Sequence, residues 1–256
     1  MADSLPSQPL VWIDCEMTGL NPDSDVILEI YCFITDGQLN LVKSPTAAAD
    51  AQKRRDKDAI DDEDRHRLQP DEDAGWGAIL HVDKARLDLM DSWCTDHHGR
   101  SGLTKAVLAS TTTHEEAADG LLAYIQKFIP NKGVGLLAGS SVHADKAFLR
   151  KAPYDRVMNH LHYRILDVST IKEAVKRWQP PPPPPPPATG PDAASSGGSG
   201  REKGGNKKKS SSSPRTTESK HRARDDILDS IAQARHYKRL LFDDPAEEAA
   251  ARNANQ

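Results

Sequence analysis

The sequence lacks the features of a membrane protein, a disulfide-bonded protein or a zinc finger. No apolar run approaches the roughly 20 residues that a transmembrane helix needs. The three cysteines, Cys15, Cys32 and Cys94, are odd in number and lack metal-finger spacing, which favours a reduced intracellular setting. The N-terminal residues MADSLPSQPL lack the charge and apolar core of a signal peptide and the arginines of a mitochondrial presequence. We therefore expect an intracellular protein without membrane contact, with a cytosolic location favoured over a mitochondrial one.

The sequence also lacks a strong excess of charge of either sign. It carries 34 Lys and Arg residues against 38 Asp and Glu residues, which gives a formal net charge of -4. This mildly acidic balance argues against a protein that holds long nucleic acid through a broad basic surface. A small nucleotide substrate remains compatible with it.

Apolar residues are scarce, at 37% of the 256 residues, and two segments account for much of the shortage. Residues 45–78 are dense in alternating charge, and residues 180–220 combine a proline run with Gly, Ser and Lys. Neither segment can bury enough apolar surface to offset the entropy lost on ordering, so both are predicted to be disordered insertions. Without them about 180 residues remain, the size of one ordinary domain. We expect this domain over residues 8–244, followed by a disordered tail at 245–256.

Outside the insertions, predicted strands alternate with predicted helices. Thr113 and Glu116 form a capping-box pattern at the start of a helix that Pro130 ends. The last helix carries an apolar face made of Ile227, Ile231, Ala234 and Leu241. Extended segments are predicted at 10–17, at 25–42 as a hairpin around Asp36-Gly37, at 133–141 and at 163–169, and helices at 111–130, 142–152, 169–178 and 225–242. This order predicts an α/β fold with a mixed sheet flanked by helices.

Carboxylates occur at three places where predicted elements end or begin. Asp14 and Glu16 lie two residues apart on a strand, so they share a face and Cys15 points the other way. Asp145 lies at the start of a helix that follows a buried strand. His221 precedes Asp226 by five residues, and Asp226 opens the last helix. A lone Asp-x-Glu pair is common where a strand meets solvent. The pair indicates catalysis only because Asp145, His221 and Asp226 accompany it.

Four carboxylates in one pocket would repel one another unless cations neutralised them. Hard oxygen ligands suit Mg²⁺ or Mn²⁺. Two such ions about 4 Å apart can activate a water and stabilise the leaving oxygen during phosphodiester cleavage. A histidine, whose pKa is close to neutrality, suits the role of general base for that water. The set therefore predicts two-metal hydrolysis of a phosphodiester.

The ordered set of Asp14, Glu16, Asp145, His221 and Asp226 resembles the DEDDh exonuclease superfamily. The stretches WIDCEMTGL, GSSVHADKAFL, HYRILDVST and RDDILDSI resemble the oligoribonucleases, which are 3'-to-5' exoribonucleases of very short RNA. The resemblance implies a ribonuclease H-like fold with a mixed five-stranded sheet. It also implies hydrolysis of single-stranded RNA of two to five nucleotides, dinucleotides above all, to nucleoside 5'-monophosphates. The four carboxylates would then hold two divalent cations, Mg²⁺ or Mn²⁺, and His221 would be the general base.

The same resemblance assigns substrate contacts. It implies that two residues wedge against and stack on bases, that three cap the 5' phosphate of a dinucleotide, and that one reaches the site across a homodimer interface; in that order these are Leu20 and Trp93, then Ser141, Arg164 and Ser169, then Tyr163. Stacking on a base contributes ~1 to 3 kcal/mol without reading sequence. Arginine forks onto a terminal phosphate, and a longer chain would collide with the closed end.

Some alternatives remain open in the sequence. Trp93 is equally explained as a half-buried structural tryptophan, and His98 matches a family histidine but is explained as well by a surface turn, so it is left out of the site. Asp225 competes with its neighbour Asp226, which spacing favours. The basic residues 201–224 are either a solvated linker, the simpler interpretation, or an arm that concentrates RNA.

The sequence departs from the family pattern at two places, and two other functions compete with the exoribonuclease. Ser140 replaces the asparagine of the family's GNS stretch, and a long insertion precedes His221. The competing functions are a non-catalytic module that binds short nucleotides and a nuclease that acts on DNA ends. The complete set of ligands and base argues against the first. The cap residues and the acidic net charge argue against the second.

Overall fold

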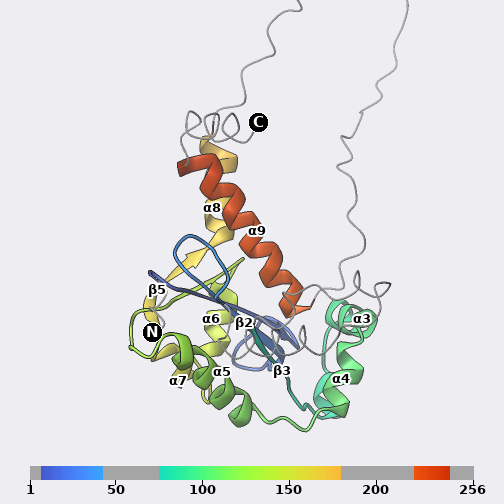
Figure 1. The fold of residues 1–256 in the computed structure, drawn as a ribbon. Coiled ribbons are helices and arrows are strands. Elements are labelled where there is room, and N and C mark those ends of the chain that lie inside the picture. The colour runs from blue at the N-terminus through green and yellow to red at the C-terminus, as the bar shows by residue number, and fades with distance from the viewer. Residues whose placement is uncertain (1–6, 43–74, 180–221, 243–256) are drawn as a thin grey trace, which may run out of the picture.

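A computed structural model describes residues 7–42, 75–179 and 222–242, which build a five-stranded sheet flanked by helices (Figure 1). The strands are β1 (Leu10–Met17), β2 (Ile27–Thr35), β3 (Trp76–Ile79), β4 (Leu136–Gly139) and β5 (His162–Asp167), in the order β3-β2-β1-β4-β5. The β1–β2 and β2–β3 pairs are antiparallel, and the β1–β4 and β4–β5 pairs are parallel. The mixed five-stranded sheet expected from the sequence is confirmed.

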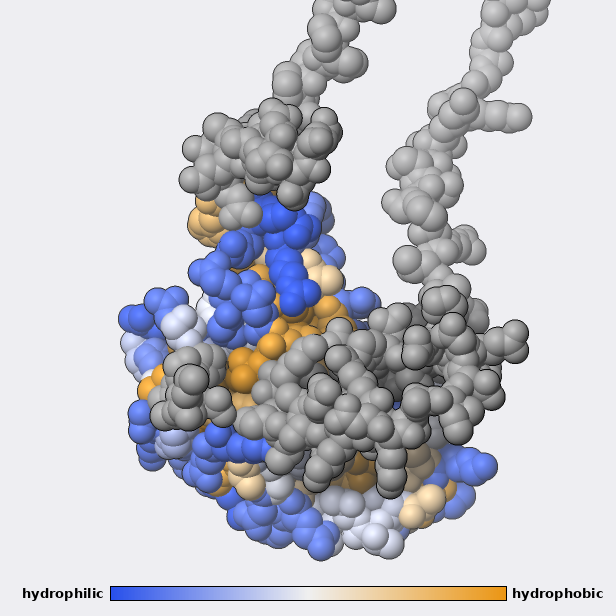
Figure 2. Space-filling model, in the orientation of Figure 1, coloured by the Kyte–Doolittle hydropathy of each residue, from blue (hydrophilic) through white to orange (hydrophobic). Residues whose placement is uncertain are grey.

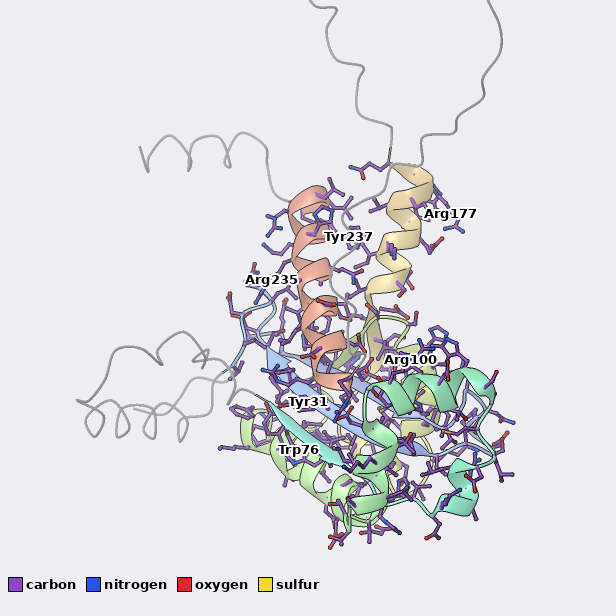
Figure 3. The ribbon with its side chains drawn as sticks, turned by 90° about the vertical axis from the view of Figure 1, so that its right-hand side faces the viewer. Tyr31, Trp76, Arg100, Arg177, Arg235 and Tyr237 are labelled. Atoms are coloured by element: carbon purple, nitrogen blue, oxygen red, sulfur yellow. The ribbon has the colours of Figure 1, made fainter. Side chains whose placement is uncertain are left out.

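The helices of the described ranges lie on both faces of this sheet. They are α2 (Lys84–Leu87), α3 (Ser92–Arg100), α4 (Leu103–Ala109), α5 (His114–Phe128), α6 (His143–Leu149), α7 (Asp155–Met158), α8 (Val168–Trp178) and α9 (Ala223–Phe242). Helices α8 and α9 run side by side and project beyond the sheet (Figures 1 and 3). Among the described residues, no helix is long and apolar enough to cross a membrane.

Strand β1 is the centre of the sheet, and its alternation assigns each side chain to one of two cores. Ile13 and Cys15 belong to the core that α5 and α6 cover, whereas Trp12 belongs to the opposite core beneath α9. Trp12 is fully buried, and its Nε1 donates to Thr35 Oγ1 at 3.0 Å. Asp14 and Glu16 continue the row of Trp12, so they emerge on the side of α9.

The caps and the buried face of α5 agree with its sequence pattern. The Thr113 side chain accepts from the N–H of Glu116, and the Glu116 side chain accepts from the N–H of Thr113, so the predicted capping box is present. The helix ends at Phe128, two residues before Pro130. Its buried residues include Ala117, Leu121 and Ile125. The helix therefore covers one face of the sheet with a 3.6-residue repeat.

The predicted insertion at 45–78 is wrong at its C-terminal end. Residues 76–79 form β3, which pairs with β2 from Cys32 to Glu29. A Cβ at Gly120 would lie 2.8 Å from the Trp76 ring, so this helical glycine makes room for the strand's tryptophan. Four residues are too few for an alternating pattern to stand out from the charged run before them. The rest of that insertion, the predicted insertion at 180–220 and the predicted tail lie outside the described residues.

Two smaller expectations also need correction. The predicted hairpin around Asp36-Gly37 is present but short: its return segment forms one isolated bridge, Thr35 with Leu41, and the N–H of Val42 donates to the carbonyl oxygen of Ile34. Farther along β2, β3 takes this edge. In α9, Ile227, Ile231 and Ala234 are buried, but Leu241 is 43% exposed. The C-terminal part of α9 extends beyond the sheet, so Leu241 has no residues of the described strands to pack against. Figure 2 shows this change, with hydrophobic side chains where α9 meets the sheet and hydrophilic ones over its outer part.

Candidate active site

The second half of β1 has one open edge, and Asp145 fills it. Strand β2 pairs with β1 along its length, but β4 pairs only from Leu10 to Trp12. The N–H of Cys15 therefore has no strand partner on the β4 side, and it donates to Asp145 Oδ1 at 3.0 Å. Asp145 is 5% exposed and comes from the first turn of α6, directly after β4. The short β4 thus places this carboxylate beside β1.

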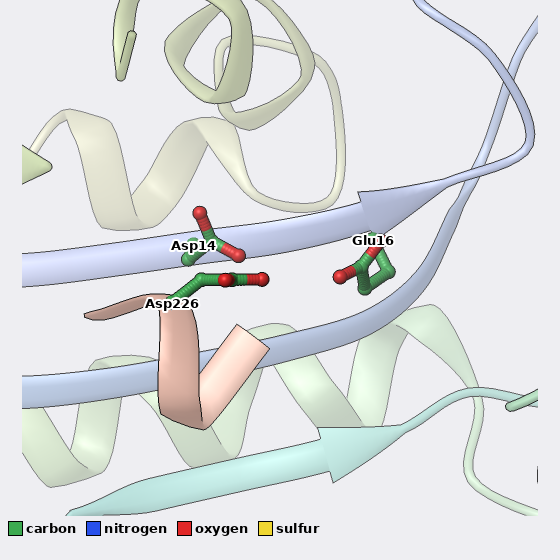
Figure 4. Close-up of side chains that lie close together, drawn as sticks. All are labelled: Asp14, Glu16 and Asp226. Carbon is green, nitrogen blue, oxygen red and sulfur yellow. The ribbon is translucent and has the colours of Figure 1, made fainter. Parts of the chain in front are cut away.

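Three carboxylates converge on the side of β1 that α9 covers (Figure 4). Asp14 and Glu16 project from the strand, and Asp226 approaches from the first turn of α9. One oxygen of each lies within 4.8 Å of an oxygen of the other two. Asp145 is outside this group of three, although its charge acts on Asp14. The structure therefore brings together three of the four carboxylates named from the sequence, and the fourth, Asp145, is near enough for its charge to act on Asp14. His221 lies outside the described residues.

The pKa values of these carboxyl groups show how strongly the site holds protons. Burial, and then the charges of Asp145 and Asp226, raise the pKa of Asp14 well above its ordinary value. Burial and the charge of Asp226 raise the pKa of Glu16 to about 8, against the opposing effect of Arg222. Burial raises the pKa of Asp145 to about 7, although the Cys15 N–H favours its ionised form. A cluster of hard oxygens whose ionisation needs compensating charge fits Mg²⁺ or Mn²⁺.

His98 lies next to the site, and the surface turn expected for it from the sequence is wrong. It belongs to α3 and is 1% exposed. Its Nε2 lies 2.9 Å from the carbonyl oxygen of Met17, and its Nδ1 lies 3.9 Å from Glu16 Oε2. Burial lowers the pKa of His98, so its neutral form donates from Nε2 to Met17. The available signal was its helical spacing from Cys94, which is also buried.

Two of the three residues expected to cap a phosphate, Ser141 and Ser169, are hydrogen-bonded to Asp167. Asp167 Oδ1 accepts from the N–H of Ser141 at 3.0 Å and from the N–H of Ser169 at 2.9 Å, and the two serine hydroxyl oxygens are 3.1 Å apart. Ser141 has a φ of 55°, a left-handed conformation that these hydrogen bonds hold. Arg164 is exposed, and its guanidinium lies 5.3 Å from the ring centroid of Tyr163. The two serine hydroxyls therefore lie together at Asp167, and Arg164 is an exposed cation three residues earlier on β5.

Comparisons with known proteins agree with this geometry. The family model RNase_T, described as Exonuclease, matches residues 11–63 and 79–181. The chain is 37% identical over 243 residues to the mitochondrial oligoribonuclease of Mus musculus, covering 94% of this chain and 77% of that protein. It is 32% identical over 239 residues to the oligoribonuclease of Photobacterium profundum, covering 93% of this chain and 98% of that protein. The chain belongs to the oligoribonucleases of the RNase T exonuclease family.

Two further comparisons define how far this family membership extends. The mitochondrial oligoribonuclease of Saccharomyces cerevisiae is 44% identical over 173 residues, which cover 68% of this chain. That match spans only 55% of the yeast protein. Among solved structures, exonuclease I from Methylocaldum szegediense is 14% identical with a TM-score of 0.50, covering 91% of this chain and 41% of that chain. This last likeness supports the fold of the oligoribonuclease chain.

The two predicted base-contacting residues of this oligoribonuclease chain, and the residue predicted to cross a homodimer interface, are exposed. Leu20 is 78% exposed, Trp93 is 66% exposed and Tyr163 is 73% exposed. Because Trp93 is mostly exposed, its interpretation as a half-buried structural tryptophan is wrong. Its ring stacks on that of His97, with centroids 4.6 Å apart. An exposed hydrophobic side chain loses no native packing when it contacts a ligand.

Leu20 is presented by a loop that hydrogen bonds fix in place. Asp25 Oδ1 accepts from Thr18 Oγ1 at 2.9 Å and from Arg86 at 2.7 Å, and its Oδ2 accepts from the N–H of Asn21 at 2.9 Å. The residue beside Leu20 is Gly19, where a Cβ would lie 2.5 Å from Asp25 Oδ2. The loop is therefore packed tightly around one carboxylate, which fixes where Leu20 projects.

Without added metal, the thermal stability of this oligoribonuclease chain is expected to fall as pH rises from about 5 to 8. The folded-state pKa values of Glu16, about 8, and Asp145, about 7, lie above their ordinary values. The folded protein therefore binds more protons than the unfolded chain across this window. That stabilisation is fully present below the ordinary pKa values and is lost as pH rises through the raised ones. Melting temperatures in EDTA at several pH values measure the effect.

A pair of variants assigns this pH dependence to the site. Glu16→Gln should flatten the fall in melting temperature, because one of the raised groups is removed. Asp96→Asn should leave it unchanged, since the Asp96 side chain is 68% exposed and pairs with Arg100 on α3. A melting temperature of the unmodified protein that is constant from pH 5 to 8 would show that the buried carboxyl groups do not hold protons as described.

Proposed function

We propose that this chain is a metal-dependent 3'-to-5' exoribonuclease that hydrolyses RNA of two to five nucleotides, dinucleotides above all, to nucleoside 5'-monophosphates. The observation that carries the proposal is the convergence of oxygens from Asp14, Glu16 and Asp226 within 4.8 Å, beside the buried Asp145. The relatives from mouse and Photobacterium, both named oligoribonucleases, support the substrate class. The proposed catalytic domain covers residues 8–244.

The four carboxylates are proposed to hold two divalent cations, Mg²⁺ or Mn²⁺. When bound, such cations neutralise the carboxylates and stabilise the charge that develops on the phosphodiester under attack. The protein contributes the fixed oxygens of β1, α6 and α9, so little reorganisation is needed during the reaction. His221, the residue before Arg222, is proposed to accept the proton of the attacking water.

The substrate is proposed to lie between the exposed side chains described above. Leu20 and Trp93 contact the bases, because stacking is favourable without sequence preference. Ser141, Arg164 and Ser169 bind the 5' phosphate, and Tyr163 is contributed by the partner in a homodimer. The hydrogen bonds of Asp167 to Ser141 and Ser169 support a preformed cap. The cytosolic location stays a prediction, and the relatives from yeast and mouse are named mitochondrial.

A time course on 5'-labelled RNA of two, five and twenty nucleotides tests the proposal, with Mg²⁺, Mn²⁺ or EDTA. The dinucleotide should disappear at least about tenfold faster than the twenty-mer, because a hydrogen bond to a charged group contributes about 1.5 to 3 kcal/mol and only a short chain places its 5' phosphate in the cap. EDTA should stop the reaction. Preferential attack on the twenty-mer would retain the metal chemistry and contradict the cap. No cleavage of any length would favour the module that only binds nucleotides.

A further inference from the structure

Helix α9 begins at an ion pair that the proposed reaction does not use. Arg222 directly precedes the helix, and its guanidinium forks onto Glu29: Nε donates to Oε2 at 2.8 Å and Nη2 donates to Oε1 at 2.5 Å. Glu29 Oε2 also accepts from the N–H of Ala223 at 3.3 Å. One carboxylate on β2 therefore binds both the arginine and the first N–H of the helix.

This ion pair lies next to the carboxylate cluster. Glu29 is directly opposite Glu16 in the β1–β2 register and is 6% exposed. The Arg222 side chain is 29% exposed. Bidentate arginine–carboxylate pairs fix orientation as well as distance. Residues that are 193 positions apart in the sequence are thus joined within the sheet face that carries the site.

The geometry of the ion pair passes directly to Asp226. The N–H of Asp226 donates to the carbonyl oxygen of Arg222 at 3.1 Å, and the N–H of Asp225 donates to the same oxygen at 2.9 Å. Four residues are about one helical turn, so Asp226 lies above Arg222 on the same side of α9. A shift or rotation at Arg222 would move the Asp226 carboxylate away from Asp14 and Glu16.

The ion pair also balances charge in a crowded region. An unpaired Glu29 would add a further negative charge beside Glu16, and the charge of Glu29 already raises the pKa of Glu16. Arg222 acts in the opposite direction on Glu16. The guanidinium is therefore placed where it lets two neighbouring carboxylates coexist while leaving Glu16 with its oxygens available.

We propose that Glu29 and Arg222 form a positioning latch for the cation site: their bidentate ion pair fixes the start of α9 so that Asp226 stays within coordinating distance of Asp14 and Glu16. Both are positioning residues, since neither belongs to the group of oxygens that converge. The consequence for RNA hydrolysis rests on the proposed function above. The consequence for cation binding does not depend on the substrate.

Two single variants separate this latch from a simple charge effect. Glu29→Gln removes a negative charge near the site, and Arg222→Gln removes a positive one. If only charge mattered, the first would weaken the binding of a cation and the second would strengthen it. Both variants break the same fork, so the latch predicts that both weaken cation binding.

Mn²⁺ alone is the probe, and its dissociation constant is measured by calorimetry or by electron paramagnetic resonance. Glu29→Gln, Arg222→Gln and the double variant should each bind Mn²⁺ about 10- to 100-fold more weakly, as is usual when a partner that orients metal ligands is lost. The double variant should be no worse than the weaker single one, because one contact is removed only once. Arg222→Lys should be intermediate, since lysine keeps the charge and loses the fork.

Arg235→Gln is the matched control on the same helix. Arg235 Nη2 and Nε donate to the carbonyl oxygen of Leu39 at 2.6 and 3.2 Å, which ties α9 to the turn after β2 (Figure 3). This variant loosens the docking of α9 away from the carboxylates, so it should bind Mn²⁺ like the unmodified protein. Equal weakening in Arg235→Gln would mean that general helix stability, and not the latch, controls the site.

The Mn²⁺ affinity of Arg222→Gln decides between the latch and a simple charge effect. Tighter or unchanged Mn²⁺ binding by Arg222→Gln overturns the latch. Circular dichroism establishes that each variant is folded, and the double variant guards against loss of fold because it leaves no unpaired charge buried. If the unmodified protein fails to hydrolyse RNA, the proposed function fails while the Mn²⁺ affinities still test the latch.

Discussion

Asp14→Asn is expected to lower the rate of dinucleotide hydrolysis by at least about 10³-fold, while raising the melting temperature of the metal-free protein. The loss follows from weaker cation binding, since cations contribute several kcal/mol of charge stabilisation and each 1.36 kcal/mol is tenfold in rate. The gain in stability follows from burial and the neighbouring carboxylates, which raise the pKa of Asp14 because its ionised form is unfavourable there. Asparagine keeps the size of the side chain and removes that charge.

Asp226→Asn and Asp225→Asn form the matched comparison for this prediction. The oxygens of Asp226 lie with those of Asp14 and Glu16, whereas the Asp225 side chain is 57% exposed and pairs with Arg224. Steady-state rates and melting temperatures in EDTA should show Asp226→Asn inactive and Asp225→Asn nearly unchanged. Loss of activity together with loss of stability in Asp14→Asn would mean that the residue supports the fold rather than the reaction.

The parts of the site that follow from local patterns could be predicted from the sequence. A strand has a period of two, so Asp14 and Glu16 had to share a face and Cys15 had to enter the opposite core, as it does. The pattern of a buried strand followed by a helix also places Asp145 in the first turn of that helix. These inferences needed only neighbours within a few residues.

The parts that depend on pairing length could not be predicted in this way. Asp145 accepts from the N–H of Cys15 because β4 stops pairing with β1 at Trp12. The sequence of β4 does not indicate where this pairing ends. His98 reaches Met17 across 81 positions, and Arg222 reaches Glu29 across 193. Such contacts appear only when the sheet order is known. A lone histidine or glutamate in the sequence is equally consistent with a surface position.

The charged run before β3 hid a strand for a related reason. The first three residues of β3, Trp76 to Ala78, fall at the end of the predicted disordered insertion, because composition is averaged over many residues. In the fold, Gly77 pairs with Tyr31 so closely that a Cβ would lie 2.2 Å from the tyrosine ring. The edge strand is therefore specified by its contacts with β2, which is far earlier in the sequence, and with α5, which is later.

Arg164→Ala is expected to reduce kcat/KM about 10²-fold for a dinucleotide that carries a 5' phosphate. A bidentate contact to a phosphate supplies about two charge-assisted hydrogen bonds of 1.5 kcal/mol or more each. The loss should be small for the same dinucleotide without its 5' phosphate. Lys146 donates to the carbonyl oxygen of Tyr163 at 2.9 Å, which ties the strand segment that carries Arg164 to α6.

Arg150→Ala tests whether Arg164 acts through its position or only through its charge. Arg150 is exposed and lines a cavity with Lys146 and Tyr163, so it is a nearby cation outside the predicted cap. If it loses as much activity as Arg164→Ala, long-range attraction of RNA explains both. Arg164→Lys should recover only part of the loss, since an ammonium cannot fork onto two phosphate oxygens. A full recovery by lysine would contradict the bidentate cap, and with it the physical reason for preferring the shortest RNA.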